Sequence, residues 1–409
     1  MTRATTEVAA LPAVQQTLHE AADTGALPQL ASWQRGPLAD LVTATFQQPE
    51  RIRHFDPASW DLLIRQARRA NLLARLAWLL KSRDLWDAVL PAAKPHLESA
   101  WAFSQRQRIA VRWEVECIGK ALHSTGVPLV LLKGAGYVAL DLPAAAGRLV
   151  SDVDILVPKD RITEVESALM IHGWHTIHHG AYDQRYYRRW MHEIPPMRHL
   201  RRGTVIDVHH ALLPGTARIK VDSDAMRGMA TEVPGQGGVF VLAPADMVLH
   251  SATHLFHEGE LDNGLRDVVD LDSLLRHFGE HPGFWDGLVP RARAVGLGRP
   301  LFYALRYAAR ILGTPVPAGV IAAAAEGGPG RALCKVMDFL FLRALRPNHP
   351  TCSDVWTRLA RWMLYVRSHW LRMPLPLLLY HLARKAVIRE EHDDTPRPQP
   401  PLAVDQPPR

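Results

Sequence analysis

The sequence predicts an α+β fold in which a small mixed-sheet core lies between an N-terminal and a C-terminal helical region. Apolar residues recur at intervals of three and four from about Pro57 to Leu122, as they do in amphipathic helices. Short apolar runs with β-branched residues then replace this period, which is typical of buried strands. Beyond about Pro244 the helical period returns. A strand-containing unit therefore separates two helical ones.

The first two predicted strands lie close together in the sequence. One is in VPLVLLKG, between Pro128 and Gly134, and a glycine-containing loop is expected to follow it. The other is DVDILV (152–157), where aspartate alternates with valine and isoleucine. Because successive side chains of a strand point to opposite faces, Asp152 and Asp154 are expected to share one face.

A helix and a third strand complete the predicted core. The helix lies in KDRITEVESALMIHGW, after Pro158 and before a stop at Gly173. The strand lies in TVIDVHHAL (204–212), with Asp207 and His209 on the same face. The order of strand, helix and strand indicates a small α/β unit.

Composition changes along the chain suggest how it is organised. The C-terminal tail is Pro-rich and charged without an apolar face, so it is predicted to be disordered. The predicted units are a partly ordered N-terminal lead (1–50), a helical region (51–125), the α/β core (126–243), a helical C-terminal region (244–388) and the disordered tail (389–409).

Length, charge and cysteine content limit the class of protein. The chain has 409 residues, of which 47% are hydrophobic, so it can bury a sizeable core. Its net charge of +7 is compatible with anionic partners. The three cysteines are far apart and form neither a zinc-binding nor a disulfide pattern. The sequence shows no secretory leader and no apolar run of membrane-spanning length, so a cytoplasmic location is expected.

The paired aspartates predict a metal site. Asp152 and Asp154 would lie a few ångströms apart and repel each other unless a cation lies between them. Magnesium prefers hard oxygen ligands and leaves room for substrate phosphates. Asp207, in a strand of similar character, is the candidate third carboxylate. We therefore predict that Asp152, Asp154 and Asp207 bind Mg²⁺ or Mn²⁺ and carry the chemistry.

Residues near the predicted loop suit the binding of a phosphate. Gly134 allows backbone amides to approach an anion closely. Lys133 and Arg148 supply positive charge on either side, and Ser151 supplies a hydroxyl group just before the second strand. These four residues are predicted to bind the nucleotide.

The order of these motifs resembles that of the nucleotidyltransferase superfamily with the DNA polymerase β-like core. The segments LLKGAGYVAL, GRLVSDVDILV, VIDVHHAL and LRDVVDLDSLL are similar to those of a bacterial family of uncharacterised nucleotidyltransferases often found in biosynthetic gene clusters. The resemblance extends from roughly Trp60 to Leu275. It implies a Mg²⁺-dependent enzyme that moves NMP from an NTP to an unidentified small-molecule, peptide or protein acceptor.

The resemblance also implies roles for particular residues. Asp152 and Asp154 match the metal-binding pair, Asp207 matches the third carboxylate, and Gly134 matches the glycine of a helical turn after the first strand. The superfamily usually has Gly-Ser at this turn, whereas Ala135 follows the glycine here.

This departure leaves phosphate contact to Lys133 and Arg148, and it supports an alternative. In that alternative, the chain is a catalytically inactive nucleotide-binding or regulatory protein of the same fold.

Several histidines have more than one interpretation. His209, beside Asp207, could orient the substrate or act as a base. His250, His254 and His257 lie on one face of a predicted helix, where they could bind zinc or line the nucleotide cleft.

Two further patterns lie in the C-terminal half of the chain. Arg266 and Asp270 have the spacing of a structural i, i+4 ion pair. The basic, aromatic stretch RLARWMLYVRSHWLRMPLPLLLYHLARK suggests either a membrane-surface helix or the core of a helical subdomain. Nucleic acid is not an expected partner, because no known binding motif is present.

Overall fold

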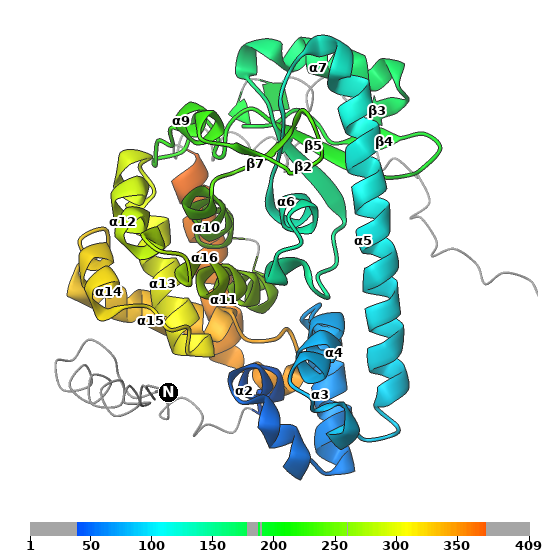
Figure 1. The fold of residues 1–409 in the computed structure, drawn as a ribbon. Coiled ribbons are helices and arrows are strands. Elements are labelled where there is room, and N and C mark those ends of the chain that lie inside the picture. Colours follow the sequence, from blue (N-terminus) through cyan, green and yellow to red (C-terminus); the bar gives the residue numbers. More distant parts are fainter. Residues whose placement is uncertain (1–38, 178–186, 189, 260, 374–409) are drawn as a thin grey trace, which may run out of the picture.

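The computed structural model describes residues 39–177, 187–188, 190–259 and 261–373 (Figure 1). Within these residues, a mixed sheet is flanked by helices from both sides of the sequence, which confirms the predicted fold class. The sheet has seven strands in the order β3-β4-β5-β2-β1-β7-β6. The strands are β1 (Leu129–Leu131), β2 (Asp152–Leu156), β3 (Trp174–Thr176), β4 (Met197–His199), β5 (Val205–His209), β6 (Thr231–Glu232) and β7 (Val239–Val241).

The helices account for the rest of the regular structure. Those before and within the core are α2 (Leu41–Gln47), α3 (Pro57–Arg69), α4 (Leu73–Ser82), α5 (Lys94–Leu122), α6 (Lys133–Ala139), α7 (Ile162–Ile171) and α9 (Ser223–Gly228). Those after it are α10 (Pro244–Thr253), α11 (Gly264–Gly279), α12 (Phe284–Ala294), α13 (Gly298–Leu312), α14 (Ala318–Ala325), α15 (Arg331–Ala344) and α16 (Val355–Arg372). A π-helical turn, His254–Glu258, follows α10 directly.

The helical lead-in forms as its sequence period predicts. Asp56 caps α3 by accepting a hydrogen bond from the Ser59 backbone amide at 2.8 Å, and Pro57 occupies the first turn. The apolar stripe of α3, including Trp60 and Leu63, is fully buried. The long helix α5 then runs beside the sheet, where it contacts both α7 and β2 (Figure 1).

Four of the seven strands were not predicted. β3, β4 and β7 have three residues each and β6 has two, which is too short for an alternating pattern to be visible. The predicted strands are present as β1, β2 and β5. β1 lies antiparallel to β2, whereas β1 with β7 and β2 with β5 are parallel pairs.

The segment after β1 is a helix and not the loop that its glycines suggested. α6 begins at Lys133, which agrees with the helical turn implied by the family resemblance. Glycine weakens isolated helices, but here it permits close packing. A Cβ atom at Gly136 would lie 3.3 Å from the Leu131 carbonyl oxygen. The small residues therefore let α6 lie directly against the end of β1.

A buried ion network connects the lead-in, the core and the C-terminal helices. Asp270 of α11 accepts hydrogen bonds from Arg75 of α4 at 3.2 Å and from Arg148 at 2.7 Å. All three side chains are at most 10% exposed. Arg75 also donates to the carbonyl oxygens of Pro143 and Ala144. One carboxylate thus compensates two buried guanidinium groups from distant parts of the sequence.

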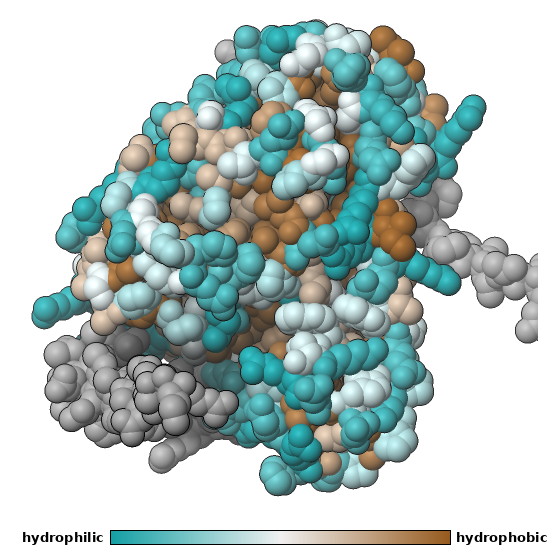
Figure 2. All heavy atoms as spheres, viewed as in Figure 1, coloured by the Kyte–Doolittle hydropathy of each residue, from teal (hydrophilic) through white to brown (hydrophobic). Residues whose placement is uncertain are grey.

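The visible surface mixes hydrophilic and apolar residues, with apolar groups between the charged ones (Figure 2). Among the described residues, none of the helices is both long enough and apolar enough to cross a bilayer.

We expect Asp270→Asn to lower the free energy of unfolding by about 3–5 kcal/mol, because it leaves two buried cations without their counter-charge. Urea denaturation followed by circular dichroism measures this change. Asp61→Asn is the matched control, since the Asp61 side chain is 62% exposed in an i, i+4 pair with Arg65 and is expected to change stability by about 1 kcal/mol or less. Equal losses in the two variants would contradict a structural role for the network.

Candidate active site

The three aspartates that were predicted to bind metal come together on one face of the sheet. Asp154 of β2 is the direct register partner of Asp207 of β5 in a parallel pair. Residues in register on adjacent strands point to the same face, and Asp152 precedes Asp154 by two residues on that face. The three residues offer carboxylate oxygens that all lie within 4.8 Å of one another.

The three carboxyl groups differ in how readily they ionise. Burial opposes ionisation of Asp154, but Lys133 and a hydrogen bond from His209 outweigh it and hold the pKa of Asp154 well below its usual range. Burial and the charge of Asp154 raise the pKa of Asp152. Burial, Asp154 and Glu193 together raise the pKa of Asp207 to about 7.

This donor set fits a hard divalent cation. The Oδ1 atom of Asp207 is buried and accepts no hydrogen bond from the part of the chain that the structure describes. A buried carboxylate oxygen without a donor is costly unless a cation binds it. Three carboxylates are the oxygen ligands that Mg²⁺ and Mn²⁺ prefer, and a cation among them would offset the repulsion that raises two of the pKa values.

Lys133 supplies positive charge beside the aspartates. Its Nζ atom lies 3.9 Å from the Asp154 Oδ2 atom. Lys133 has a φ angle of 40°, a backbone region that non-glycine residues rarely occupy and that costs on the order of 1 kcal/mol. This strained residue is the first of α6, so the turn from β1 into the helix brings its ammonium group to the acidic cluster.

Gly134 and Arg148 lie against each other behind this turn. A Cβ atom at Gly134 would lie 2.2 Å from Arg148 Nη1, so the guanidinium group fills the space that a side chain would need. The Arg148 Nε atom donates to Asp270. The structure thus gives Arg148 a protein carboxylate as partner, and its contact with a phosphate stays a prediction. Ser151 Oγ donates to Asp152 Oδ1 at 3.0 Å, so its role toward the nucleotide also stays a prediction.

His209 lies between two carboxylates. Its Nε2 atom is 3.4 Å from Asp154 Oδ1, and its Nδ1 atom is 3.4 Å from Glu193 Oε2. Burial alone would lower the pKa of His209, but the hydrogen bond to Asp154 and the charge of Glu193 raise it to about 9. The imidazole is therefore positively charged near neutral pH and adds to the stabilisation of ionised Asp154.

Two residues beside His209 were not predicted as part of the site. His192 and Glu193, together with His209, offer donor atoms that lie within 4.8 Å of one another. Glu193 also forms an isolated antiparallel β-bridge with His209. The segment HEIPP has no periodic pattern, so the only signal in the sequence is the adjacent pair of polar, ligand-type side chains.

The histidines of the α10 segment do not form a common metal site. The ligand-capable groups found among the described residues are the two sets above, and neither contains His250, His254 or His257. His250 lines a small cavity together with Lys133, and its role beside a nucleotide stays a prediction. Burial and Lys133 hold the pKa values of His250 and His254 well below the usual range.

The predicted ion pair between Arg266 and Asp270 is wrong. Arg266 Nη2 donates to Asp267 Oδ1 at 2.8 Å, the carboxylate next to it in sequence. Asp270 points inward to Arg75 and Arg148. The i, i+4 spacing was present in the sequence, but Asp270 points to two buried guanidinium groups, while Arg266, whose side chain is 17% exposed, pairs with the adjacent Asp267.

A cavity of about 630 Å³ opens between the start of α11 and α16. His254, Arg266, Asp267, Arg361, Trp362 and Tyr365 are among the residues that line it. Lys133 and Asp154 both act electrostatically on the His254 imidazole. His254 follows His250 by one helical turn, and His250 lines a small cavity together with Lys133.

A mixed sheet with three carboxylates on two adjacent parallel strands, and a helical turn after the neighbouring strand, is consistent with the nucleotidyltransferase core that the sequence resemblance implies. The model of the family described as "Uncharacterised nucleotidyltransferase" matches residues 56–313, and the chain belongs to this family. Neither a curated protein nor a solved structure matches the chain.

We expect Asp207 to make the metal-free protein less stable as the pH rises from about 4 to about 7. Its pKa in the folded protein, about 7, exceeds the ordinary value of 3.8. In this window the unfolded chain has released a proton that the folded protein keeps, so the free energy of unfolding falls as the pH rises.

Asp207→Asn removes this dependence. In the presence of EDTA, its melting temperature is expected to exceed that of the wild type by several degrees near pH 8, and by less near pH 5. Asp160→Asn, an exposed substitution, is the control. A shift that is the same at both pH values would show that Asp207 is not protonated in the folded, metal-free protein.

Proposed function

We propose that the protein is a Mg²⁺- or Mn²⁺-dependent nucleotidyltransferase that moves NMP from an NTP to an acceptor and releases pyrophosphate. The observation that carries this proposal is the register of β2 and β5, which sets Asp154 beside Asp207 with Asp152 two residues away. Membership of the nucleotidyltransferase family supports the reaction class. The acceptor is a small molecule, a peptide or a protein.

In the proposed reaction, an acceptor oxygen or nitrogen atom attacks the α-phosphorus of the NTP. The bond from this phosphorus to the oxygen that bridges to the β-phosphate breaks, and pyrophosphate leaves with that electron pair. Asp152, Asp154 and Asp207 would hold the divalent cations. When bound, these cations neutralise negative charge on the triphosphate and lower the pKa of an acceptor hydroxyl group.

The remaining residues of the site would position the reactants. Lys133, beside Asp154, is placed to neutralise phosphate oxygens, and Gly134 lets the first turn of α6 approach them. Arg148, held by Asp270, and Ser151 are the further candidates for nucleotide contact. His209 would keep Asp154 ionised and oriented through its hydrogen bond, and so help to orient the substrate.

The cavity between α11 and α16 is a suitable place for the acceptor. It offers both aromatic rings and charged groups, which are the features of sites that bind polar organic molecules, and His254, which lines it, lies one helical turn from His250.

We expect millimolar MgCl₂ plus an NTP to raise the melting temperature of the wild-type protein. The bound cation neutralises the carboxylates, and the triphosphate interacts with the Lys133 ammonium group. A ligand at about 100 times its dissociation constant adds roughly 2.7 kcal/mol to the free energy of unfolding. A thermal-shift screen of ATP, GTP, CTP and UTP, each with and without metal, measures this. Absence of any shift with all four nucleotides would rule out the nucleotide-binding proposal.

Substitution of single aspartates separates binding from catalysis. Asp152→Asn and Asp154→Asn each remove a metal-binding charge, so NMP transfer is expected to collapse while the circular dichroism spectrum stays unchanged. Asp207→Asn is expected to bind Mg-NTP within about tenfold of the wild type but to lose two or more orders of magnitude in rate, on the order of 3 kcal/mol in the barrier.

Pyrophosphate release and isothermal titration calorimetry measure the two quantities, with Asp160→Asn as the matched control. A wild-type protein that binds Mg-NTP without releasing pyrophosphate with any acceptor offered, and an Asp207→Asn variant that behaves identically, would support the inactive, regulatory alternative instead.

A further inference from the structure

The outer side of α16 carries a row of exposed apolar residues. The helix buries Thr357, Ala360 and Leu364 against the rest of the protein. Away from this buried side, an exposed stripe repeats at intervals of three and four, so its members lie along one line of the helix. The stripe consists of Trp356, Leu359, Met363, Val366 and Trp370. Such a helix, apolar on two sides, normally has a partner on both.

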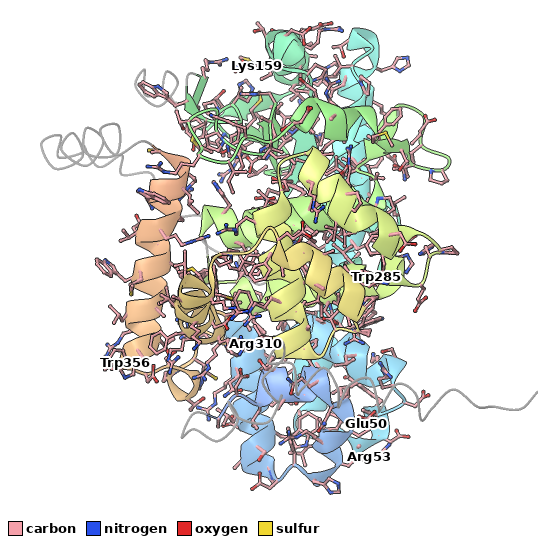
Figure 3. The ribbon with its side chains drawn as sticks, turned by 90° about the vertical axis from the view of Figure 1, so that its left-hand side faces the viewer. Glu50, Arg53, Lys159, Trp285, Arg310 and Trp356 are labelled. Atoms are coloured by element: carbon pink, nitrogen blue, oxygen red, sulfur yellow. The ribbon has the colours of Figure 1, made fainter. Side chains whose placement is uncertain are left out.

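The neighbouring helix α15 widens this stripe into a continuous surface. Leu333, Val336 and Phe339 are exposed on α15. The ring of Phe339 meets that of Trp356 edge to face at 6.1 Å between centroids, so the two rows join. Figure 3 shows α16 at the edge of the molecule, with Trp356 on its outer side. We call this surface the α15–α16 face.

The rim of the α15–α16 face is basic. α16 contains no aspartate or glutamate, and of its four arginines, Arg361 and Arg367 donate to the carbonyl oxygens of Arg346 and Phe256. Arg358 is exposed beside the stripe, and Arg331 and Lys335 are exposed on α15. At the two ends of the face, the guanidinium group of Arg343 lies 3.9 Å over the Phe339 ring and that of Arg218 lies 4.0 Å over the Trp370 ring.

Acidic residues near the face are few: Asp354, at the start of α16, accepts hydrogen bonds from the backbone amide and the hydroxyl group of Thr357. The one acidic residue of α15, Asp338, is paired with Arg306 and Arg310, each at 2.6 Å. The sequence that follows α16 is also apolar and basic, and contains no aspartate or glutamate as far as Arg389. The face therefore combines exposed apolar side chains with more basic than acidic groups.

We propose that the α15–α16 face docks on the surface of a bilayer that contains anionic phospholipids, with α16 lying in the plane of the interface. The apolar stripe would enter the boundary between headgroups and acyl chains, where tryptophan is favoured. The arginines at the rim would meet lipid phosphates and keep their charged ends in the headgroup layer. A second copy of the chain suits the face less well, because two basic rims would then oppose each other.

Co-sedimentation of the full-length protein with vesicles tests the proposal. One set of vesicles is phosphatidylcholine alone, and the other contains about one third phosphatidylglycerol. The protein is expected to bind the anionic vesicles at least tenfold more tightly, with a blue shift of tryptophan emission, and binding is expected to weaken as salt is added. Absence of binding to the anionic vesicles, or equal binding to both sets, overturns the proposal.

Substitutions locate the contact. The double variant Phe339→Ser with Trp356→Ser is expected to lower vesicle affinity at least tenfold. Arg358→Glu is expected to lower it roughly thirtyfold, because it changes the charge by two and each unit of charge near such a surface contributes about a fivefold change in affinity. Trp113→Ser is the matched control, because Trp113 is 53% exposed on α5, away from the face. Circular dichroism and melting temperature verify that each variant is folded.

Other results would also decide the matter. Equal vesicle binding by the double variant and the wild type would place the contact elsewhere. A dimer in sedimentation equilibrium that the double variant abolishes, together with no vesicle binding, would make the face a protein interface and overturn the proposal.

Discussion

Parallel pairing of β2 with β5 holds Asp154 directly beside Asp207, and the rest of the site is arranged around this juxtaposition of like charges. The residues that alternate with the aspartates, such as Val153 and Ile206, are buried on the other face of the sheet. A slip of one residue in the register would exchange the two sets and bring carboxylates into the core. Hydrophobic packing on one face therefore keeps mutually repelling groups together on the other.

Neighbouring groups affect the ionisation of Asp154 and Asp207 differently. The Lys133 ammonium group and the charged His209 imidazole lie beside Asp154. Asp207, in contrast, has a buried oxygen atom that accepts no hydrogen bond from the described residues. Asp154 is thereby kept ionised, whereas Asp207 keeps its proton to a higher pH and would release it when a cation binds. The positive φ angle of Lys133 belongs to the same arrangement, since it accompanies the turn that brings the ammonium group to Asp154.

The strands that carry the aspartates could be predicted because alternation of charged and branched residues is a local signal. The four short strands, the helical state of Lys133–Ala139 and the place of Glu193 depend on packing between distant segments, which no local pattern records. Arg266 shows the same limit, because spacing suggested Asp270 as its partner and long-range ion pairs decided otherwise. The proposed nucleotide contacts and the unit boundaries remain predictions, and the tail predicted as disordered lies outside the described residues.

The carboxylate of Asp270 also bears on how this protein can change over evolutionary time. It joins α4, the segment before β2 and α11, so its ion pairs cross both of the predicted borders of the α/β core. Loss of Asp270 leaves two buried guanidinium groups without their counter-charge, and loss of either arginine removes one hydrogen-bond partner of Asp270, so the effects of substitutions at the three positions depend on one another. Arg75, Arg148 and Asp270 are therefore expected to be inherited together. Recombination between relatives would yield folded proteins mainly when all three residues come from the same parent sequence. The α/β core is therefore not expected to fold when it is moved into another protein without its flanking helices.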